Sequence, residues 1–206
     1  MATGRFDVVG FDCDGVMFDT RSANRAYYDQ VLQHFGLPCM DDTQFSYVHM
    51  HTVNEAMKLL FPDEGLYRKA MAYRKTMAYA SFLPLMTIEP DLRNLLAKLR
   101  GRCRTAVATN RSDTMIPLLQ AHGLENSFDL VVTSLQVFRP KPSPDQLHLI
   151  CDHFRIPSRR LLYIGDSEVD EAAARAAGAR LAAYRNINLE ADYHIQRLWQ
   201  VLDILQ

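Results

Sequence analysis

The sequence predicts an α/β protein with a doubly wound, mostly parallel sheet and an all-helical insert. Two observations predict this fold. Short apolar runs typical of buried strands alternate with amphipathic helical segments along most of the 206 residues. Residues 17–84 interrupt this alternation, because they show helical periodicity and no convincing strand. We therefore expect a core domain from residues 1–16 and 85–206, and a helical domain from residues 17–84 inserted after the first strand.

The first strand is predicted at residues 8–11, where the chain reads VVGF. In the insert, apolar spacing predicts two helices, punctuated by Pro38, Pro62 and Pro84. The first helix has an apolar face made of Ala56, Leu59 and Leu60. The second has an apolar face made of Leu66, Ala70, Tyr73 and Met77.

The remaining elements alternate as a doubly wound sheet requires. A helix after Pro90 would bury a leucine stripe, a second would begin at Ser143 and Pro144, and a third over residues 168–177 would end at Gly178. A last helix is expected over residues 194–205. The strands between them are predicted at residues 105–108, 129–132, 161–164 and 178–183.

Composition indicates an ordinary globular protein. Hydrophobic residues make up 48% and charged residues 23%, and the formal net charge of -1 gives no pull toward nucleic acid. We find no run of about 20 apolar residues and no signal-peptide pattern, so we expect no membrane partner and a cytoplasmic location. The four cysteines form no C-x-x-C pair, which favours free thiols. We expect a monomer or a homodimer.

Two carboxylates directly follow the first predicted strand. Asp12 and Asp14 stand two residues apart, with Gly15 next to turn the chain. Mg²⁺ with phosphoryl transfer is the leading explanation, because Mg²⁺ prefers oxygen ligands and leaves room for a substrate phosphate. A plain turn would also give this pattern. An EF-hand is excluded, since the twelfth loop position is Ala23 and not Glu.

Polar clusters follow three other predicted strands in the same way. Because ligands of an open parallel sheet bind outside the carboxyl ends of its strands, all four clusters would converge at one edge. Besides the two acids, these clusters are Thr109-Asn110-Arg111, Arg139-Pro140-Lys141-Pro142, and Gly165-Asp166-Ser167 with Asp170.

In this order the clusters resemble the four motifs of the haloacid dehalogenase (HAD) superfamily, in its phosphoglycolate phosphatase and β-phosphoglucomutase branch. The resemblance covers essentially the whole chain. It implies a Rossmann-like HAD core with a helical cap over the active site. Val16 departs from the family, where many members carry Thr. The matching residues are Asp12 and Asp14, Thr109, Lys141, and Asp166 with Ser167 and Asp170.

Each of these residues has an expected role. Asp12 would attack phosphorus, and Asp14 would act as general acid and base. Lys141, stiffened by flanking prolines, would neutralise the phosphate and the Asp12 carboxylate. The resemblance implies the same roles, and adds that the backbone carbonyl of Asp14 binds the metal. The metal ligands would be Asp12, Asp14 and Asp166.

Thr109 is expected to donate its hydroxyl to the phosphoryl oxygens, together with the backbone amide of Asn110. Arg111 completes the expected phosphate-binding set. For Thr109 a simple helix cap is the alternative, with Ser112 as its rival for that position. Ser167 and Asp170 are expected to support the site, and for Asp170 the alternative is compensation of a helix N-terminus.

His49 and His51 form an H-x-H pair in the insert. A zinc site is a poor interpretation, because no Cys, Asp or Glu partner has matching spacing. We expect both histidines to contact polar groups of the substrate.

The function expected from these residues is Mg²⁺-dependent removal of phosphate from a small phosphorylated metabolite through an aspartyl-phosphate. One alternative is a sugar-phosphate mutase, which needs the same residues. Another is a non-catalytic binding protein on the same fold.

Overall fold

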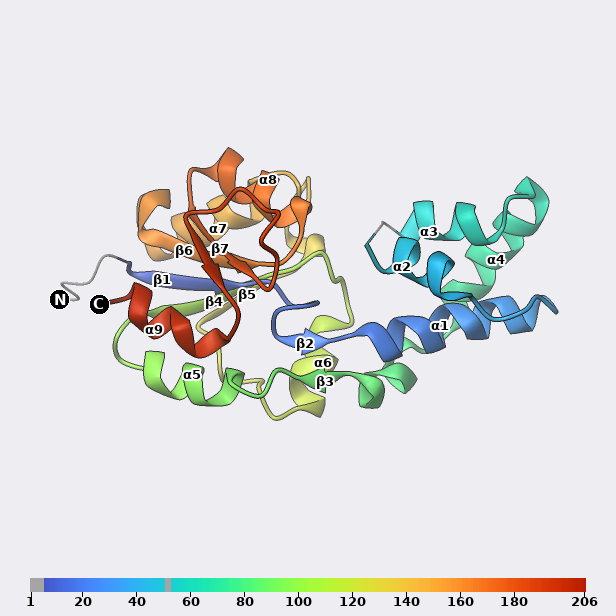
Figure 1. Cartoon of the computed structure of the whole chain (residues 1–206), viewed down its shortest axis with the longest axis horizontal. Coiled ribbons are helices and arrows are strands. Elements are labelled where there is room, and N and C mark those ends of the chain that lie inside the picture. Colours follow the sequence, from blue (N-terminus) through green and yellow to red (C-terminus); the bar gives the residue numbers. More distant parts are fainter. Residues whose placement is uncertain (1–5, 51–52) are drawn as a thin grey trace. The chain divides into compact units, whose positions relative to one another are not determined.

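The computed structural model describes residues 6–50 and 53–206. The chain divides into two compact units, one formed by Met1–Asp19 with Ile88–Gln206 and the other by Thr20–Thr87 (Figure 1). We refer to them as the core unit and the helical unit. The helical unit begins and ends three residues later than the insert expected over residues 17–84.

The core unit contains a six-stranded parallel sheet in the order β5-β4-β1-β6-β7-β8. The chain first winds from β1 through β4 to β5, and then returns to the other side of β1, so the topological switch point lies at β1. The strands are β1 (Val8–Phe11), β4 (Arg104–Ala108), β5 (Leu130–Val132), β6 (Leu161–Gly165), β7 (Arg180–Tyr184) and β8 (Tyr193–Ile195).

Helices cover both faces of this sheet, as a parallel sheet requires. In Figure 1, α7 (Asp145–Phe154) and α8 (Glu168–Ala177) lie on one face, and α5 (Leu92–Leu99) and α9 (Val201–Ile204) on the other. A further helix of this unit is α6 (Met115–Ala121), and short 3₁₀ helices occur at η2 (Ser134–Gln136), η3 (Ser158–Arg160) and η4 (Leu198–Gln200).

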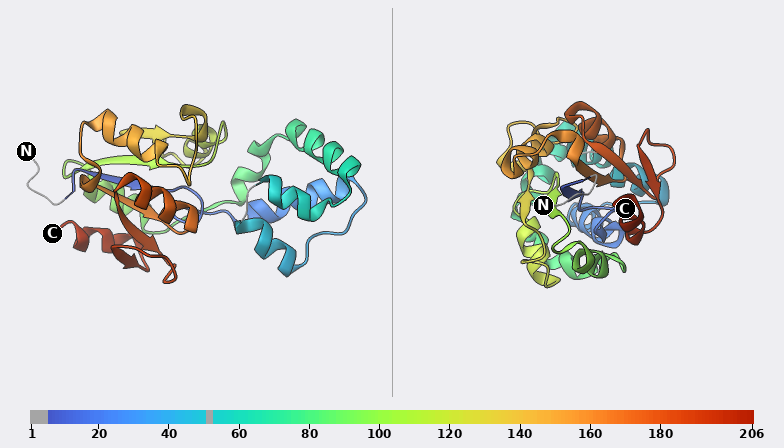
Figure 2. Two further views of the ribbon diagram at one scale, coloured as in Figure 1. Left: turned by 90° about the horizontal axis from the view of Figure 1, so that it is seen from above. Right: turned by 90° about the vertical axis from the view of Figure 1, so that its left-hand side faces the viewer.

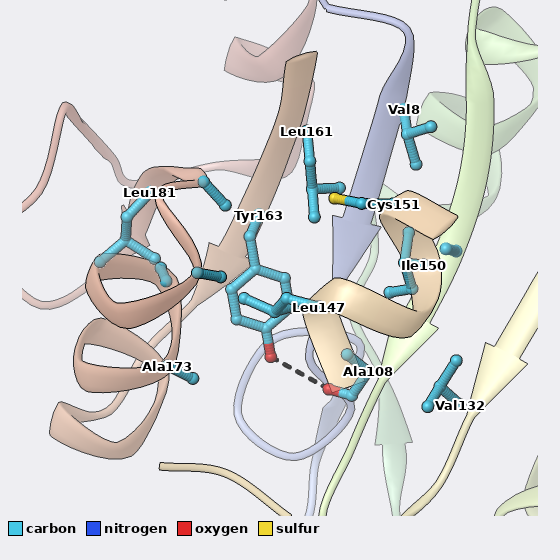
Figure 3. Packing of buried hydrophobic residues seen from close by; sticks show 14 residues of the cluster. Val8, Ala108, Val132, Leu147, Ile150, Cys151, Leu161, Tyr163, Ala173 and Leu181 are labelled. Carbon is cyan, nitrogen blue, oxygen red and sulfur yellow. Dashed lines mark hydrogen bonds between the residues drawn. The ribbon is translucent and has the colours of Figure 1, made fainter. Parts of the chain in front are cut away.

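Apolar side chains hold these layers together. Figure 3 shows Tyr163 of β6, Leu147 of α7 and Ala173 of α8 as members of one buried hydrophobic cluster. The four leucines predicted to form the stripe of α5 are all buried. Helix α8 begins and ends as predicted, with a capping box at Ser167 and Gly178 in the left-handed conformation at its end.

The helical unit contains α1 (Arg21–His34), α2 (Asp42–Met50), α3 (Val53–Leu60), α4 (Glu64–Thr76) and the 3₁₀ helix η1 (Tyr79–Leu85) (Figure 2). Its core includes an aromatic cluster in which Tyr27 meets Tyr28, Tyr79 and Phe82 edge to face. Leu59 was predicted to face inward, but it is 42% exposed, and Met57 is buried instead.

Three local predictions were wrong. A short strand, β2 (Phe18–Asp19), lies where none was expected, and it pairs with β3 (Thr87–Ile88). The helix expected over residues 194–205 is interrupted, since β8 occupies its first residues and α9 only its end. Helix α7 begins one residue late, with Pro144 as its N-cap. In the described part of the chain, no helix combines the length and apolarity of a membrane span.

Candidate active site

The register of the sheet brings the predicted motifs to one edge. Phe11, the last residue of β1, is aligned with Val107 of β4 and Ile164 of β6. The residues that follow each strand therefore lie side by side beyond the carboxyl ends. The N–H of Asp12 continues the ladder by donating to the carbonyl of Ile164 at 2.9 Å, and this bond fixes the start of the Asp12 loop.

Lys141 is the hub of the cluster. Its Nζ atom lies 2.6 Å from Oδ1 of Asp12, 2.7 Å from Oδ1 of Asp170 and 2.7 Å from the hydroxyl of Tyr163. The Lys141 side chain is 3% exposed and the Asp12 side chain is 10% exposed. The structure thus brings together Asp12, Lys141 and Asp170, as the convergence of the motifs predicted.

Sequence reasoning missed two buried residues of this network. The Tyr163 hydroxyl also lies 2.9 Å from Oδ1 of Asp170 and donates to the carbonyl of Ala108 at 3.0 Å (Figure 3). Gln146 donates from Nε2 to the carbonyl of Thr109 at 2.7 Å and is fully buried. Tyr163 lies in an apolar strand pattern and Gln146 lies in an amphipathic helix, so neither was recognised as a site residue. The signal that the sequence did offer was a polar residue at a position predicted to face the core.

Thr109 and Asn110 have local partners. The Thr109 hydroxyl is buried and accepts the N–H of Arg111 at 3.1 Å. The Asn110 side chain donates to the carbonyl of Lys141 at 2.8 Å and so ties the Lys141 loop to the end of β4. Neither Thr109 nor Ser112 caps α6, whose N-cap is Thr114. Contact of Thr109 and Asn110 with phosphate stays a prediction.

Asp14 and Arg111 form a bidentate ion pair. Nε of Arg111 donates to Oδ2 of Asp14 at 2.9 Å, and Nη2 donates to Oδ1 at 2.6 Å. The Arg111 side chain is 7% exposed and that of Asp14 is 37% exposed. The structure places the Arg111 guanidinium on the second carboxylate, and the expected contact of Arg111 with the substrate phosphate stays a prediction.

Asp166 lies against the Asp12 loop, where only glycine fits. A Cβ at Gly15 would come within 1.9 Å of Oδ2 of Asp166, and Gly15 has a φ of +82°. The backbone carbonyl of Asp166 accepts the side-chain amide of Asn186 at 2.8 Å. These contacts position the Asp166 carboxylate beside the loop that carries Asp12 and Asp14.

Among the described residues, Asp12, Asp166 and Asp170 form an acidic group whose ligand oxygens lie within 4.8 Å of one another. Both carboxylate oxygens of Asp170 already have hydrogen-bond partners. Oδ1 contacts Lys141 and Tyr163, and Oδ2 accepts the Ser167 hydroxyl at 2.6 Å. Oδ2 also accepts the N–H of Ser167 at 3.2 Å, so Asp170 takes part in the capping box of α8. Its part in the reaction stays a prediction, and Asp12 and Asp166 are the side chains better placed to bind a cation. The expected backbone ligand on Asp14 stays a prediction.

The charges of the cluster are unbalanced. Burial raises the pKa of Asp12 well above its usual range, although Lys141 opposes this effect. Burial, and then the negative charge of Asp170, raise the pKa of Asp166 to about 7. Burial acts in the same direction on Asp170, but Lys141 outweighs it and lowers that pKa. The three carboxylates of the group thus share one ammonium, that of Lys141, and a bound cation would favour the ionised forms of Asp12 and Asp166.

Of the two histidines expected to contact the substrate, His49 belongs to the described residues of the helical unit. His49 of α2 meets Nδ2 of Asn24 at 3.2 Å through its Nδ1 atom and stacks on Phe45, within the helical unit. His51 lies outside the described residues. Their contact with a substrate stays a prediction.

Comparison with known proteins identifies the family. The family model of the haloacid dehalogenase-like hydrolases matches residues 9–184. A phosphoglycolate phosphatase of Nitrosospira multiformis is 32% identical over 184 residues, covering 84% of this chain and 80% of that protein. A fructose-1-phosphate phosphatase of Escherichia coli is 31% identical over 171 residues, covering 82% of this chain and 90% of that protein.

A solved structure supports the same assignment. The crystal structure of a HAD-superfamily hydrolase of subfamily IA, variant 1, from Geobacter sulfurreducens superimposes with a TM-score of 0.89 at 35% identity. The match covers 99% of this chain and 98% of that chain. The chain therefore belongs to the haloacid dehalogenase-like hydrolases, in the phosphoglycolate phosphatase-like branch of subfamily IA, and is a phosphatase of that family that acts on small phosphorylated substrates.

Proposed function

We propose that this phosphatase removes phosphate from a small phosphorylated metabolite through an aspartyl-phosphate on Asp12, with Mg²⁺ as its cofactor. The observation that carries this proposal is the bond of 2.6 Å between Nζ of Lys141 and Oδ1 of Asp12, at the sheet's carboxyl edge. A carboxylate at the end of a strand, beside a buried cation that can neutralise an incoming phosphate, suits nucleophilic attack on phosphorus.

The first step would form a bond between a carboxylate oxygen of Asp12 and phosphorus, while the ester P–O bond breaks. The departing oxygen takes a proton from Asp14. In the second step Asp14 takes a proton from water, the water oxygen attacks phosphorus, and the bond to Asp12 breaks to release phosphate. Lys141 stays protonated throughout, because Asp12 and Asp170 raise its pKa despite the opposing effect of burial.

Asp12 and Asp166 are the side chains that would hold Mg²⁺, since both present carboxylate oxygens within 4.8 Å of each other. When bound, Mg²⁺ supplies positive charge to the phosphoryl oxygens and the nucleophile. The donor set contains oxygen only, which suits a hard cation rather than zinc.

Phosphate release tests the proposal. The purified chain should release inorganic phosphate from at least one compound in a panel of phosphorylated metabolites that includes phosphoglycolate and fructose 1-phosphate, which the names of its relatives suggest. EDTA should abolish release, Mg²⁺ should restore it, and Ca²⁺ should restore less, because its looser coordination spoils the in-line geometry. Undiminished turnover in EDTA would exclude the metal site.

The same panel separates the enzymatic alternatives. A mutase would convert a sugar phosphate into its isomer when primed by a bisphosphate and would release little phosphate. A non-catalytic protein would do neither. The presence of Asp12, Asp14, Lys141 and Asp166 in one sequence argues against the non-catalytic alternative.

A further inference from the structure

The Arg111–Asp14 ion pair has more hydrogen bonds and a more buried guanidinium than an ordinary surface ion pair. Two N–H groups of the guanidinium meet the two oxygens of one carboxylate, and Nη1 also donates to the Thr114 hydroxyl at 3.3 Å. The guanidinium is almost fully buried. Bidentate pairs of this kind fix the direction of a carboxylate as well as its distance.

The backbone on each side of the pair is also fixed. The N–H of Arg111 donates to the Thr109 hydroxyl at 3.1 Å, and its carbonyl accepts the N–H of Ser134 at 3.0 Å. On the other side, a tight turn follows Asp14, in which the N–H of Gly15 donates to the carbonyl of Phe18 at 2.9 Å. Residues 97 positions apart are thus held in one orientation.

We propose that Arg111 is a positioning residue for Asp14: it holds the acid–base carboxylate in one orientation and does not serve as a phosphate ligand. This inference rests on the proposed function, in which Asp14 gives a proton to the departing oxygen and later takes one from water. A carboxylate has about four lone-pair positions, so two N–H bonds leave positions on both oxygens for proton transfer. Fixing the carboxylate beforehand keeps those positions aligned with the reacting oxygen.

The competing role for Arg111 is direct binding of the substrate phosphate. The Nε/Nη2 edge of the guanidinium grips Asp14, and Nη1 on the other edge donates to the Thr114 hydroxyl. A bidentate phosphate contact would therefore displace Asp14 from the first edge or Thr114 from the second. The two roles predict different kinetics, because a positioning residue changes turnover and a phosphate ligand changes affinity.

The test replaces Arg111 by Met and by Lys, each in the native chain and in an Asp14→Asn background. The control is Arg160→Met. Arg160 grips Asp7 with the same bidentate geometry, at 2.7 and 2.5 Å, but at the opposite end of β1. Measurements are kcat and KM for p-nitrophenyl phosphate, the inhibition constant of inorganic phosphate, and the thermal midpoint of each variant.

Arg111→Met should lower kcat about 10- to 100-fold, which is the usual effect of misplacing a catalytic group. KM and the inhibition constant of phosphate should change little. The kcat of Arg111→Lys should lie between those of the native chain and Arg111→Met, because lysine reaches one carboxylate oxygen only. If Arg111→Met does not fold, the kcat of Arg111→Lys still tests the proposal. Arg160→Met should keep the native kcat. In the Asp14→Asn background the loss of Arg111 should cost nothing further, since it acts through Asp14.

Two results would overturn the inference. One is weaker phosphate inhibition in the Arg111 variants, with a loss that persists in Asp14→Asn, which would make Arg111 a phosphate ligand. The other is native kcat in both Arg111 variants. Failure of the proposed function has a different signature: Asp14→Asn alone would then leave turnover unchanged.

Discussion

At the scale of single residues, the candidate site depends on one buried ammonium. Lys141 contacts two carboxylates and one phenol, and each contact uses one of its three protons. The sequence predicted Lys141 and both carboxylates from their places after strands. It did not predict Tyr163, because a tyrosine within an apolar strand is indistinguishable from a packing residue until the neighbouring helix α8 is placed.

Tyr163→Phe tests this network. The change removes the hydroxyl that touches Lys141, Asp170 and the carbonyl of Ala108, so buried polar groups lose a partner. We expect a loss of about 1–3 kcal/mol in the free energy of unfolding. Turnover should fall about tenfold or more, because Lys141 is held less firmly. Denaturant unfolding and steady-state kinetics measure the two effects.

Tyr184→Phe is the control for that experiment, since it removes a buried phenol hydroxyl from the adjacent strand β7, with no hydrogen bond to Lys141 or Asp170. Equal turnover losses in the two variants would show that the Tyr163 hydroxyl has no specific part in the site.

At the scale of elements, the loop after β1 is the part that the sequence predicted best. An apolar strand followed by two acids and a glycine implied a sharp turn, and Gly15 adopts a φ of +82° there. The pairing of Asp14 with Arg111 could not be predicted, because it joins two loops that only the order of strands brings together. Strand β8 was missed for a related reason: its three residues include the polar His194, and pairing with β7 decides its conformation.

Gly15→Ala should damage the site more than the fold. The left-handed backbone costs an alanine about 1–2 kcal/mol, and the new Cβ would also displace the Asp166 carboxylate. Gly101→Ala is a matched control, because Gly101 has a φ of +80° and a Cβ added there would meet no neighbouring atom of the described residues within 4 Å. We expect similar falls in the thermal midpoint for both variants.

Activity and the Mg²⁺ concentration for half-maximal activity should separate the two glycine variants. Gly15→Ala should require more Mg²⁺ and turn over slowly, whereas Gly101→Ala should match the native chain. Native Mg²⁺ dependence in Gly15→Ala would show that Asp166 does not need this close approach.

At the scale of the whole molecule, the alternation of strands and helices predicted the parallel core, and the interruption after the first strand predicted an inserted helical segment. The sequence left the substrate open, because no motif identifies the side chains that select it. The two phosphatases described above differ in the substrate that their names give, at similar identity to this chain. Family membership thus identifies the chemistry and not the ester, which we expect side chains of the insert to select.

Substitution of two histidines of the insert tests whether the insert selects the substrate. His49→Ala and His51→Ala should alter the preference among phosphate esters more than they alter hydrolysis of p-nitrophenyl phosphate, which offers few polar groups to read. His153→Ala, an exposed histidine of α7 in the core unit, is the control and should change neither. Equal losses on every ester, or no loss on any, would mean that these histidines do not select the substrate.

The central claim is that phosphate passes through Asp12, and trapping that intermediate tests it most directly. In Asp14→Asn, p-nitrophenyl phosphate should still phosphorylate Asp12, because p-nitrophenolate leaves without a proton, while attack by water should be slow. Mass spectrometry of the quenched protein should find about one phosphoryl group per chain, on the peptide that contains Asp12. Release of p-nitrophenolate with no covalent phosphate, or the same label in a chain that also carries Asp12→Asn, would contradict the account.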